Sequence, residues 1–114
     1  MHERITTPFS CSSAVAAGDF AVLGLHRGFG DTFPEQLKNT FACLQETLGK
    51  LGWGLKDLIK VNVWLKNIKD LPAMEKRFTK YFPENEYPAR MTATTLFIDA
   101  DCLLMIDGIA HRNS

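Results

Sequence analysis

The segment from Cys102 to Ala110 constrains the fold of this chain more than any other, because it is apolar on both faces. Read as a strand, in which successive side chains alternate between faces, it has one face formed by Cys102, Leu104, Ile106, Gly108 and Ala110. The other face is formed by Leu103, Met105, Asp107 and Ile109. A strand that is apolar on both faces needs cover on both. The two helices that the chain can form would cover one face, so the other face predicts an oligomer.

Two segments have the spacing of amphipathic helices. The first begins at a capping pattern of Thr32 and Glu35 and runs for about 17–19 residues. Its apolar stripe is Leu37, Phe41, Leu44, Leu48 and Leu51. The second begins at Asp70 as its cap, ends before Pro83 and has the stripe Leu71, Met74, Phe78 and Phe82. Both stripes predict helices with one buried face.

Strands are expected at 3–7, 14–17, 20–25, 58–65, 91–98 and 102–110. Gly18-Asp19 is a hairpin turn, and Asp99-Ala100-Asp101 joins the last two strands. Alternation over 58–65 places Ile59, Val61, Val63 and Leu65 on the face toward the helices, and Lys60, Asn62 and Trp64 on the other. The order β-β-β-α-β-α-β-β predicts an α/β (α+β) fold, a mixed sheet with two helices on one face, in a single domain over 1–114.

The charge balance argues against a nucleic-acid binder. The chain has 13 Lys and Arg against 13 Asp and Glu, a formal net charge of zero, whereas such proteins usually carry a basic face. No apolar run approaches the ~20 residues of a membrane span, and the first twenty residues lack a secretory signal. Three widely spaced cysteines, Cys11, Cys43 and Cys102, form no metal-binding pattern. We therefore expect free thiols, Cys43 and Cys102 in the core, a cytoplasmic location, and no metal or cofactor.

Asp107 is the anomaly of the apolar last strand, because an ionised carboxylate is costly there unless it is paired or hydrogen-bonded. Arg90 begins the preceding strand and offers a fork of donors that suits a carboxylate. One interpretation is a structural ion pair between the two residues. The other is a site in which Arg90 holds a substrate carboxylate and Asp107 positions a water molecule. Spacing alone favours the ion pair.

Three segments carry a resemblance to a known family. Leu55 to Ile68 resembles "L-x-D-I-V-K-x-x-V-F-V-K-D-L", Tyr87 to Thr92 resembles "F-P-A-R-S/T", and Met105 to Ala110 resembles "I-E-I-E-A-I-A". These are motifs of the Rid family of imine deaminases, also called YjgF. The resemblance covers nearly the whole chain and is strongest from about Thr40 to Arg112.

The resemblance implies a chorismate-mutase-like fold and a homotrimer with sites in the clefts between subunits. It implies hydrolysis of 2-imino or enamine acids to 2-keto acids and ammonia. By position, Arg90 matches the arginine that binds the substrate carboxylate, and Asp107 matches the glutamate that places the attacking water. Thr92 matches a residue whose backbone contacts the ligand, and Tyr87 matches an aromatic residue at the pocket edge.

The chain also departs from the family pattern. Asp107 is one methylene shorter than the family's glutamate, about 1.5 Å. The family's "G-P-Y-S-Q-A" tyrosine is missing, and Cys11 or Phe9 takes its place. Its "S-G-Q" becomes Gly24-Leu25-His26, so that Gly24 is the remaining glycine of that part of the pocket. These features identify a divergent branch.

Three functions follow from this pattern, in order of preference. The first is the deaminase, with Arg90 and Asp107 as catalytic residues and Thr92, Tyr87, Gly24 and Cys11 as further substrate contacts. The second is a non-catalytic binder or sensor of small carboxylates, suggested by the altered pocket positions. The third, a ribonuclease or translation inhibitor, ranks last because the chain is neutral and lacks a His–His or His–Lys cleavage pair. Two weaker signals are His26 and Trp64. His26 is expected as a solvated loop residue, with a pocket-lining proton donor as the alternative. Trp64 is expected at a subunit contact, with stacking on a ligand as the alternative.

Overall fold

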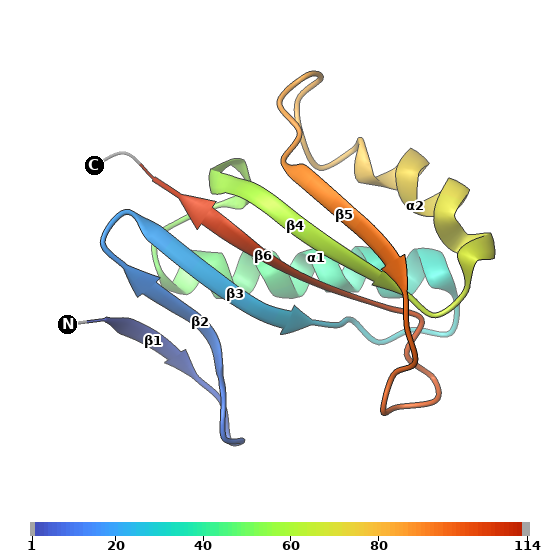
Figure 1. Cartoon of the computed structure of the whole chain (residues 1–114), viewed down its shortest axis with the longest axis horizontal. Coiled ribbons are helices and arrows are strands. Elements are labelled where there is room, and N and C mark those ends of the chain that lie inside the picture. The colour runs from blue at the N-terminus through green and yellow to red at the C-terminus, as the bar shows by residue number, and fades with distance from the viewer. Residues whose placement is uncertain (1, 113–114) are drawn as a thin grey trace.

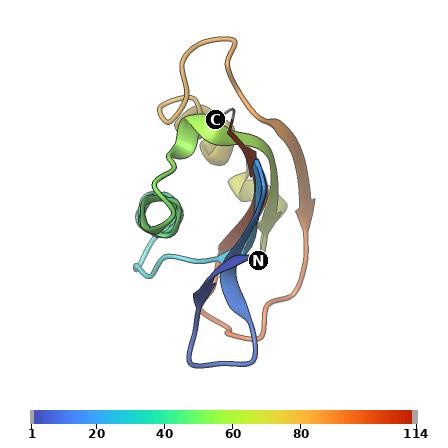
Figure 2. The same ribbon diagram turned by 90° about the vertical axis from the view of Figure 1, so that its left-hand side faces the viewer.

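The computed structural model describes residues 2–112, so that residues 1 and 113–114 of the predicted domain lie outside the described part. Six strands form one mixed sheet in the order β1-β2-β3-β6-β4-β5, with both helices on one face (Figures 1 and 2). The strands are β1 (Glu3–Thr6), β2 (Ser12–Ala17), β3 (Phe20–His26), β4 (Leu58–Leu65), β5 (Ala89–Thr94) and β6 (Leu104–His111). The helices are α1 (Phe33–Lys50) and α2 (Leu71–Phe78), with 3-10 turns at Leu55–Asp57 and Ile68–Asp70. The predicted α+β fold class and element order are confirmed.

Helix α1 begins where the capping pattern places it. The Thr32 hydroxyl oxygen accepts a hydrogen bond from the Glu35 backbone N–H at 3.3 Å and donates one to the Glu35 carboxylate at 3.2 Å. Pro34 lies in the first turn, where its missing N–H costs nothing. The helix has 18 residues, and its predicted stripe is buried apart from the half-buried Leu51.

Helix α2 is shorter than expected. It ends at Phe78, well before Pro83, and Asp70 precedes it without a side-chain capping bond. Phe82 still packs into the core from the segment that follows, because the chain turns back toward α1 there. The predicted stripe was therefore correct for burial at Met74, Phe78 and Phe82, but the helical length was not.

Strand β4 differs from simple alternation at its start. Its antiparallel pairing with β6 shifts register between Leu58 and Lys60, which is the signature of a β-bulge. As a result Leu58 is buried and Ile59 is exposed. The expectation that Ile59 shares a face with Val61 was wrong, because the extra residue at the bulge turns its side chain outward.

The last two strands do not pair with one another. Strand β5 pairs in parallel with β4, and β6 pairs with β4 and β3, so β4 lies between β5 and β6. Strand β5 ends at Thr94, and residues 95–101 form a loop instead of the expected end of the strand. The Gln36 side chain holds this connection: its amide donates to the Asp101 carbonyl at 2.8 Å and accepts from the Leu103 N–H at 2.9 Å.

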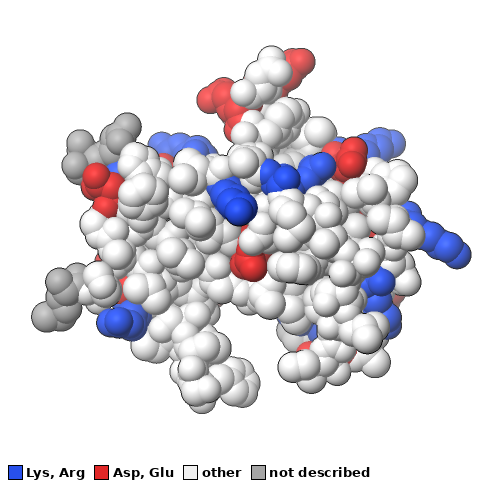
Figure 3. Space-filling view, viewed as in Figure 1, with Lys and Arg blue, Asp and Glu red and all other residues white. Residues whose placement is uncertain are grey.

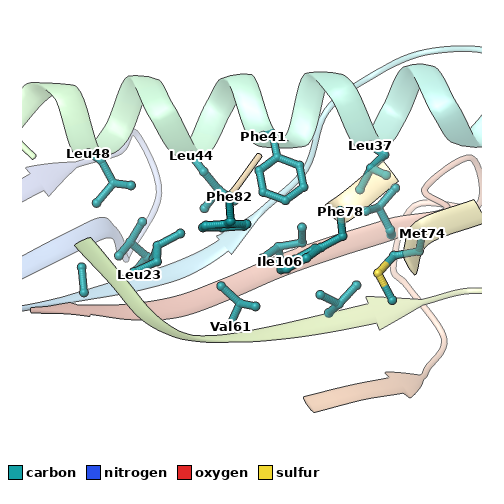
Figure 4. Packing of buried hydrophobic residues seen from close by; sticks show 14 of the residues in the cluster. Leu23, Leu37, Phe41, Leu44, Leu48, Val61, Met74, Phe78, Phe82 and Ile106 are labelled. Carbon is teal, nitrogen blue, oxygen red and sulfur yellow. The ribbon is translucent and has the colours of Figure 1, made fainter. Parts of the chain in front are cut away.

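The core fills the space between the sheet and the two helices (Figure 4). The Phe41 ring of α1 lies 5.7 Å from Phe78 and 6.3 Å from Phe82, edge to face. Val61 and Ile106 meet these rings from the sheet. The helices therefore bury the predicted apolar face of 102–110, as expected, and Cys102 lies in the core. Cys43 was also expected in the core but is only half-buried, because it lies beside the buried stripe of α1 and not on it.

The second face of the sheet has no helix over it in the described residues, and we call it the open face. It is viewed directly in Figure 3, where most of its atoms belong to uncharged residues. Val22 and Leu25 of β3 are 56% and 57% exposed there, while Trp64 and Met105 are half-buried. None of the described helices is long and apolar enough to cross a membrane.

Candidate functional site

Arg90 lies in a cavity of about 350 Å³ at the β5 edge of the sheet. The walls come from α2 and from the segment that leads into β5, and they consist of Glu75, Phe78, Thr79, Tyr87, Pro88 and Arg90. We call this cavity the Arg90 pocket. Its volume is at the small end of the range for ligand sites, which suits a molecule of a few carbon atoms.

Two contacts position the Arg90 guanidinium. Its Nη2 lies 3.6 Å from the Glu75 Oε1 atom, and its central carbon lies 5.1 Å from the centroid of the Phe78 ring. The side chain is 28% exposed, yet no hydrogen bond to another side chain or backbone atom of residues 2–112 uses its donors. A guanidinium that is fixed in place with unused donors is a ready anchor for an anion.

Asp107 lies on the open face, in the middle of β6. Its Oδ2 atom accepts a hydrogen bond from the indole Nε1 of Trp64 at 3.4 Å. A shallow cavity of about 230 Å³ lies over it and is lined by Val22, Leu23, Lys60, Asn62, Asp107, Gly108 and Ile109. The half-buried carboxylate therefore has a donor and a nearby cation, and the anomaly in the sequence is resolved by its surroundings.

Arg90 and Asp107 do not meet within one chain. In the register of the sheet, Arg90 lies beside Val61, which faces the core, whereas Asp107 lies beside Asn62, which faces the opposite way. Strand β4 also separates them. The predicted ion pair between the two residues is therefore wrong as an intramolecular contact, because it assumed that β5 and β6 are neighbours.

Of the remaining predicted site residues, Tyr87 and Thr92 lie near Arg90, whereas Gly24 and Cys11 line neither of the two cavities. Tyr87 lines the Arg90 pocket, and Thr92 lies two residues further along β5 on the same face as Arg90, with a buried hydroxyl that lacks a hydrogen-bond partner among the described residues. Gly24 lies at an irregularity in the pairing of β3 with β6. Cys11 is exposed just before β2, with its sulfur 3.7 Å from the Thr7 hydroxyl.

His26 is buried rather than solvated, with 7% of its surface exposed. Its Nδ1–H donates to the Gly24 carbonyl at 2.7 Å, so that in the neutral ring Nε2 accepts from the Thr47 hydroxyl at 2.8 Å. Burial lowers the pKa of His26, and the bond to Gly24 opposes that effect in part. The expectation of a loop histidine was wrong because β3 extends through residue 26 and turns this side chain toward α1.

The sequence did not predict the roles of three residues. These are Glu75, Arg27, and Phe78 as a support for Arg90. No local pattern connects α2 with β5, so only their packing shows that Glu75 and Arg90 share a cavity. Arg27 has a side chain that is 10% exposed and lies 3.5 Å from Asp99 and 3.4 Å from Asp101, which fixes the loop after β5.

Thiol and metal chemistry find little support in the described residues. Burial raises the pKa of the Cys43 and Cys102 thiols, which disfavours the reactive thiolate. No three His, Cys, Asp or Glu side chains within residues 2–112 are grouped so that they could hold a metal ion.

A six-stranded mixed sheet with two helices on one face defines the chorismate-mutase-like class of α+β proteins. The model of the family described as Endoribonuclease L-PSP matches residues 9–112. The chain belongs to this family, which is the Rid or YjgF family.

Relatives and solved structures agree with this membership. A RutC family protein of Pyrococcus abyssi is 31% identical over 78 residues, which is 68% of this chain and 61% of that protein. The 3-aminoacrylate deaminase RutC of Acinetobacter baylyi is 30% identical over 76 residues, 67% of this chain and 60% of that protein. These matches therefore span only about three fifths of the relatives' length.

Two solved structures have the same fold. A YjgF family protein of Neisseria meningitidis gives a TM-score of 0.93 at 20% identity, covering 100% of this chain and 97% of that one. RidA from an Antarctic Psychrobacter gives 0.86 at 22% identity, covering 96% and 94%. At this level of identity the likeness shows the fold and leaves the reaction to be argued from the site.

Proposed function

We propose that this protein is a hydrolytic deaminase that converts small 2-imino or enamine acids into 2-keto acids and ammonia. The observation that carries the proposal is Arg90, a supported guanidinium with unused donors in a cavity of about 350 Å³. A bidentate contact from such a group both holds and orients a carboxylate. The deaminase RutC among the relatives supports the same class of reaction.

Hydrolysis of an imine requires only modest catalysis from the protein. Water adds to the carbon of the C=N bond, and one of its protons passes through a nearby base to the nitrogen, which gives a carbinolamine. The remaining hydroxyl proton then moves to the nitrogen as the C–N bond breaks, which releases ammonia and leaves a C=O group. Imines hydrolyse in water unaided, so orientation and one polarised water molecule supply the acceleration. In this proposal Arg90 orients the substrate, and Asp107 accepts the proton of the water.

These two roles require two copies of the chain. Arg90 and Asp107 lie on opposite faces of one sheet, so a single site can contain both only if Arg90 comes from one copy and Asp107 from another. Such a site would combine Tyr87, Arg90 and Thr92 of one edge with Asp107 on a neighbour's open face, and with Gly24 and Cys11 of that neighbour. The exposed apolar residues of that face support a homotrimer with three such sites.

The proposal is tested with an imine generated in place by an amino-acid oxidase, following its loss with and without the purified protein. We expect acceleration by the wild type and a loss of about 100-fold or more in kcat/KM for Arg90→Ala, because the cation that holds and orients the substrate carboxylate is removed. Asp107→Asn should lower kcat/KM by about 100-fold. Arg4→Ala, an exposed arginine of β1, serves as the matched control and should leave the rate unchanged.

The outcomes separate the two leading functions. An absence of acceleration across several amino acids would exclude the deaminase. Calorimetric binding of 2-keto acids that depends on Arg90 but occurs without turnover would support the carboxylate binder instead. Equal rates for wild type and Arg90→Ala would show that the Arg90 pocket is not the site.

A further inference from the structure

The Arg90 pocket contains a negative charge as well as a positive one. Glu75 lines the cavity together with Arg90, and the two side chains lie 3.6 Å apart at their closest charged atoms. We propose that the pocket selects dipolar ligands, which carry a carboxylate and a cationic nitrogen on adjacent carbon atoms, and that Glu75 determines this preference. The inference rests on the proposed function, since it concerns the same cavity.

The contact between Glu75 and Arg90 is loose. At 3.6 Å it is longer than a hydrogen bond, and the Glu75 side chain is 55% exposed. Exposed ion pairs of this kind contribute little to folding. Within residues 2–112 the Glu75 carboxylate makes no other ion pair and accepts no hydrogen bond, so its charge is free to act on whatever enters the cavity.

The geometry decides where a ligand can approach. The guanidinium carbon of Arg90 lies over the Phe78 ring, and the donors of a guanidinium point outward in its plane, where a carboxylate binds. The Glu75 Oε1 atom lies 3.6 Å from one of these donors, Nη2. A ligand carboxylate bound there would therefore lie close to a second carboxylate.

Electrostatics then discriminates between ligands by charge. A 2-keto acid brings one negative charge and is repelled by Glu75 as it binds Arg90. A 2-iminium acid brings a positive nitrogen next to its carboxylate and can neutralise both side chains at once. The other walls of the cavity, Phe78, Tyr87 and Pro88, add no charge. Hydrolysis removes the cationic nitrogen as ammonia, so the same arrangement would weaken binding of the keto acid product and favour its release.

The preferred substrate is therefore the protonated imine of a small 2-amino acid. An enamine acid with an uncharged nitrogen should bind less well, because it presents only its carboxylate. Within one chain this distinction comes from Glu75, because Arg90 by itself would accept any small carboxylate. Asp107 of the neighbouring copy, in the proposed site, would act in the same direction, so the Glu75→Gln comparison measures the contribution of Glu75.

The test compares two stable probes with the same carbon skeleton, 2-oxobutanoate and the zwitterion 2-aminobutanoate, by calorimetry. For the wild type we expect the zwitterion to bind about tenfold more tightly than the keto acid, as for one charge pair a few ångströms apart near a protein surface. Glu75→Gln should shift the ratio of the two Kd values about tenfold toward the keto acid. Glu46→Gln, which removes the same charge from an exposed site on α1, should leave the ratio unchanged.

Either of two results would overturn the inference: a Kd ratio that Glu75→Gln leaves unchanged, or a wild type that binds neither probe. The measurement does not depend on turnover. A protein that hydrolyses imines but shows an unchanged ratio would keep its proposed function and lose the charge selection. A protein whose Kd ratio shifts but which hydrolyses no imine would keep the charge selection and lose the proposed function.

Discussion

Arg90 is supported by an ion pair and by an aromatic ring, and neither contact occupies its hydrogen-bond donors. This combination restricts the side chain before a ligand arrives, which lowers the entropy lost on binding. Asp107 is held differently, by a single indole N–H on the open face. At the scale of the residue, the Arg90 guanidinium is therefore preorganised to bind an anion, and the Asp107 carboxylate remains accessible.

His26 is the residue whose protonation should affect stability. Burial lowers its pKa in the folded chain below the ordinary value of 6.5, so the unfolded chain binds the proton more readily. The free energy of unfolding should therefore be unaffected above that value and should fall as the pH drops through it, until the folded chain is protonated as well. We therefore expect a lower free energy of unfolding at pH 5.5 than at pH 7.5.

Urea denaturation of the wild type and of His26→Asn at the two pH values measures this effect. The variant is less stable at both, because the bonds to Gly24 and Thr47 are changed, but its pH dependence should be smaller than that of the wild type. His2→Asn, an exposed position, should keep the wild-type dependence. An identical pH dependence for wild type and His26→Asn would contradict the assignment.

At the scale of the element, the pairing of β4 with β6 depends on a glycine. A Cβ atom at Gly108 would lie 2.7 Å from the Lys60 carbonyl oxygen and 3.3 Å from a Val61 methyl group. The close approach occurs next to the β4 bulge, where the pairing of β4 with β6 shifts register between Leu58 and Lys60. The bulge and the glycine therefore form one structural feature that sets which β4 residues face the core.

Gly108→Ala should accordingly lower the free energy of unfolding by about 1–3 kcal/mol, because a backbone carbonyl cannot move aside as a flexible side chain could. Gly49→Ala provides the contrast, since a Cβ there meets nothing within 4 Å and alanine is the better helix former. It should raise the same quantity by up to about 1 kcal/mol. Thermal or urea unfolding measures both, and equal effects of the two changes would contradict the close contact at Gly108.

At the scale of the whole molecule, the open face is the feature that a single chain leaves unexplained. Leu25, Trp64 and Met105 lie around one shallow apolar cavity on it, together with the fully exposed Ile98. Contiguous apolar surface of this kind marks a contact between proteins. The proposed trimer would cover it and would bring the Arg90 pocket of one copy toward the open face of another.

Sedimentation velocity tests the trimer directly. The wild type should sediment as a trimer, and Leu25→Glu should shift it toward the monomer, because a charge would be placed in the contact. Ile68→Glu changes an equally exposed residue beside α2 and should leave the trimer intact. A monomeric wild type, or a Leu25→Glu variant that remains trimeric, would contradict the proposed assembly.

Local pattern determined most of the fold. The stripes of α1 and α2, the Thr32 cap, the Gly18-Asp19 turn and the two-faced β6 all depend on residues near in sequence, so alternation and helical spacing predicted them. The family motifs also singled out Arg90 and Asp107. The bulge at Ile59 escaped prediction, because it depends on how β4 meets a strand more than forty residues away.

Tertiary structure decided how the site is divided. Only the strand order places β4 between Arg90 and Asp107 and turns the two side chains to opposite faces. Only the packing of α2 against the edge of β5 brings Glu75 beside Arg90. Sequence by itself determined which elements form and which residues carry the charge. The sheet register and the helix packing decided which charges meet, because contacts between distant segments follow from the arrangement of whole elements and leave no periodic trace in the chain.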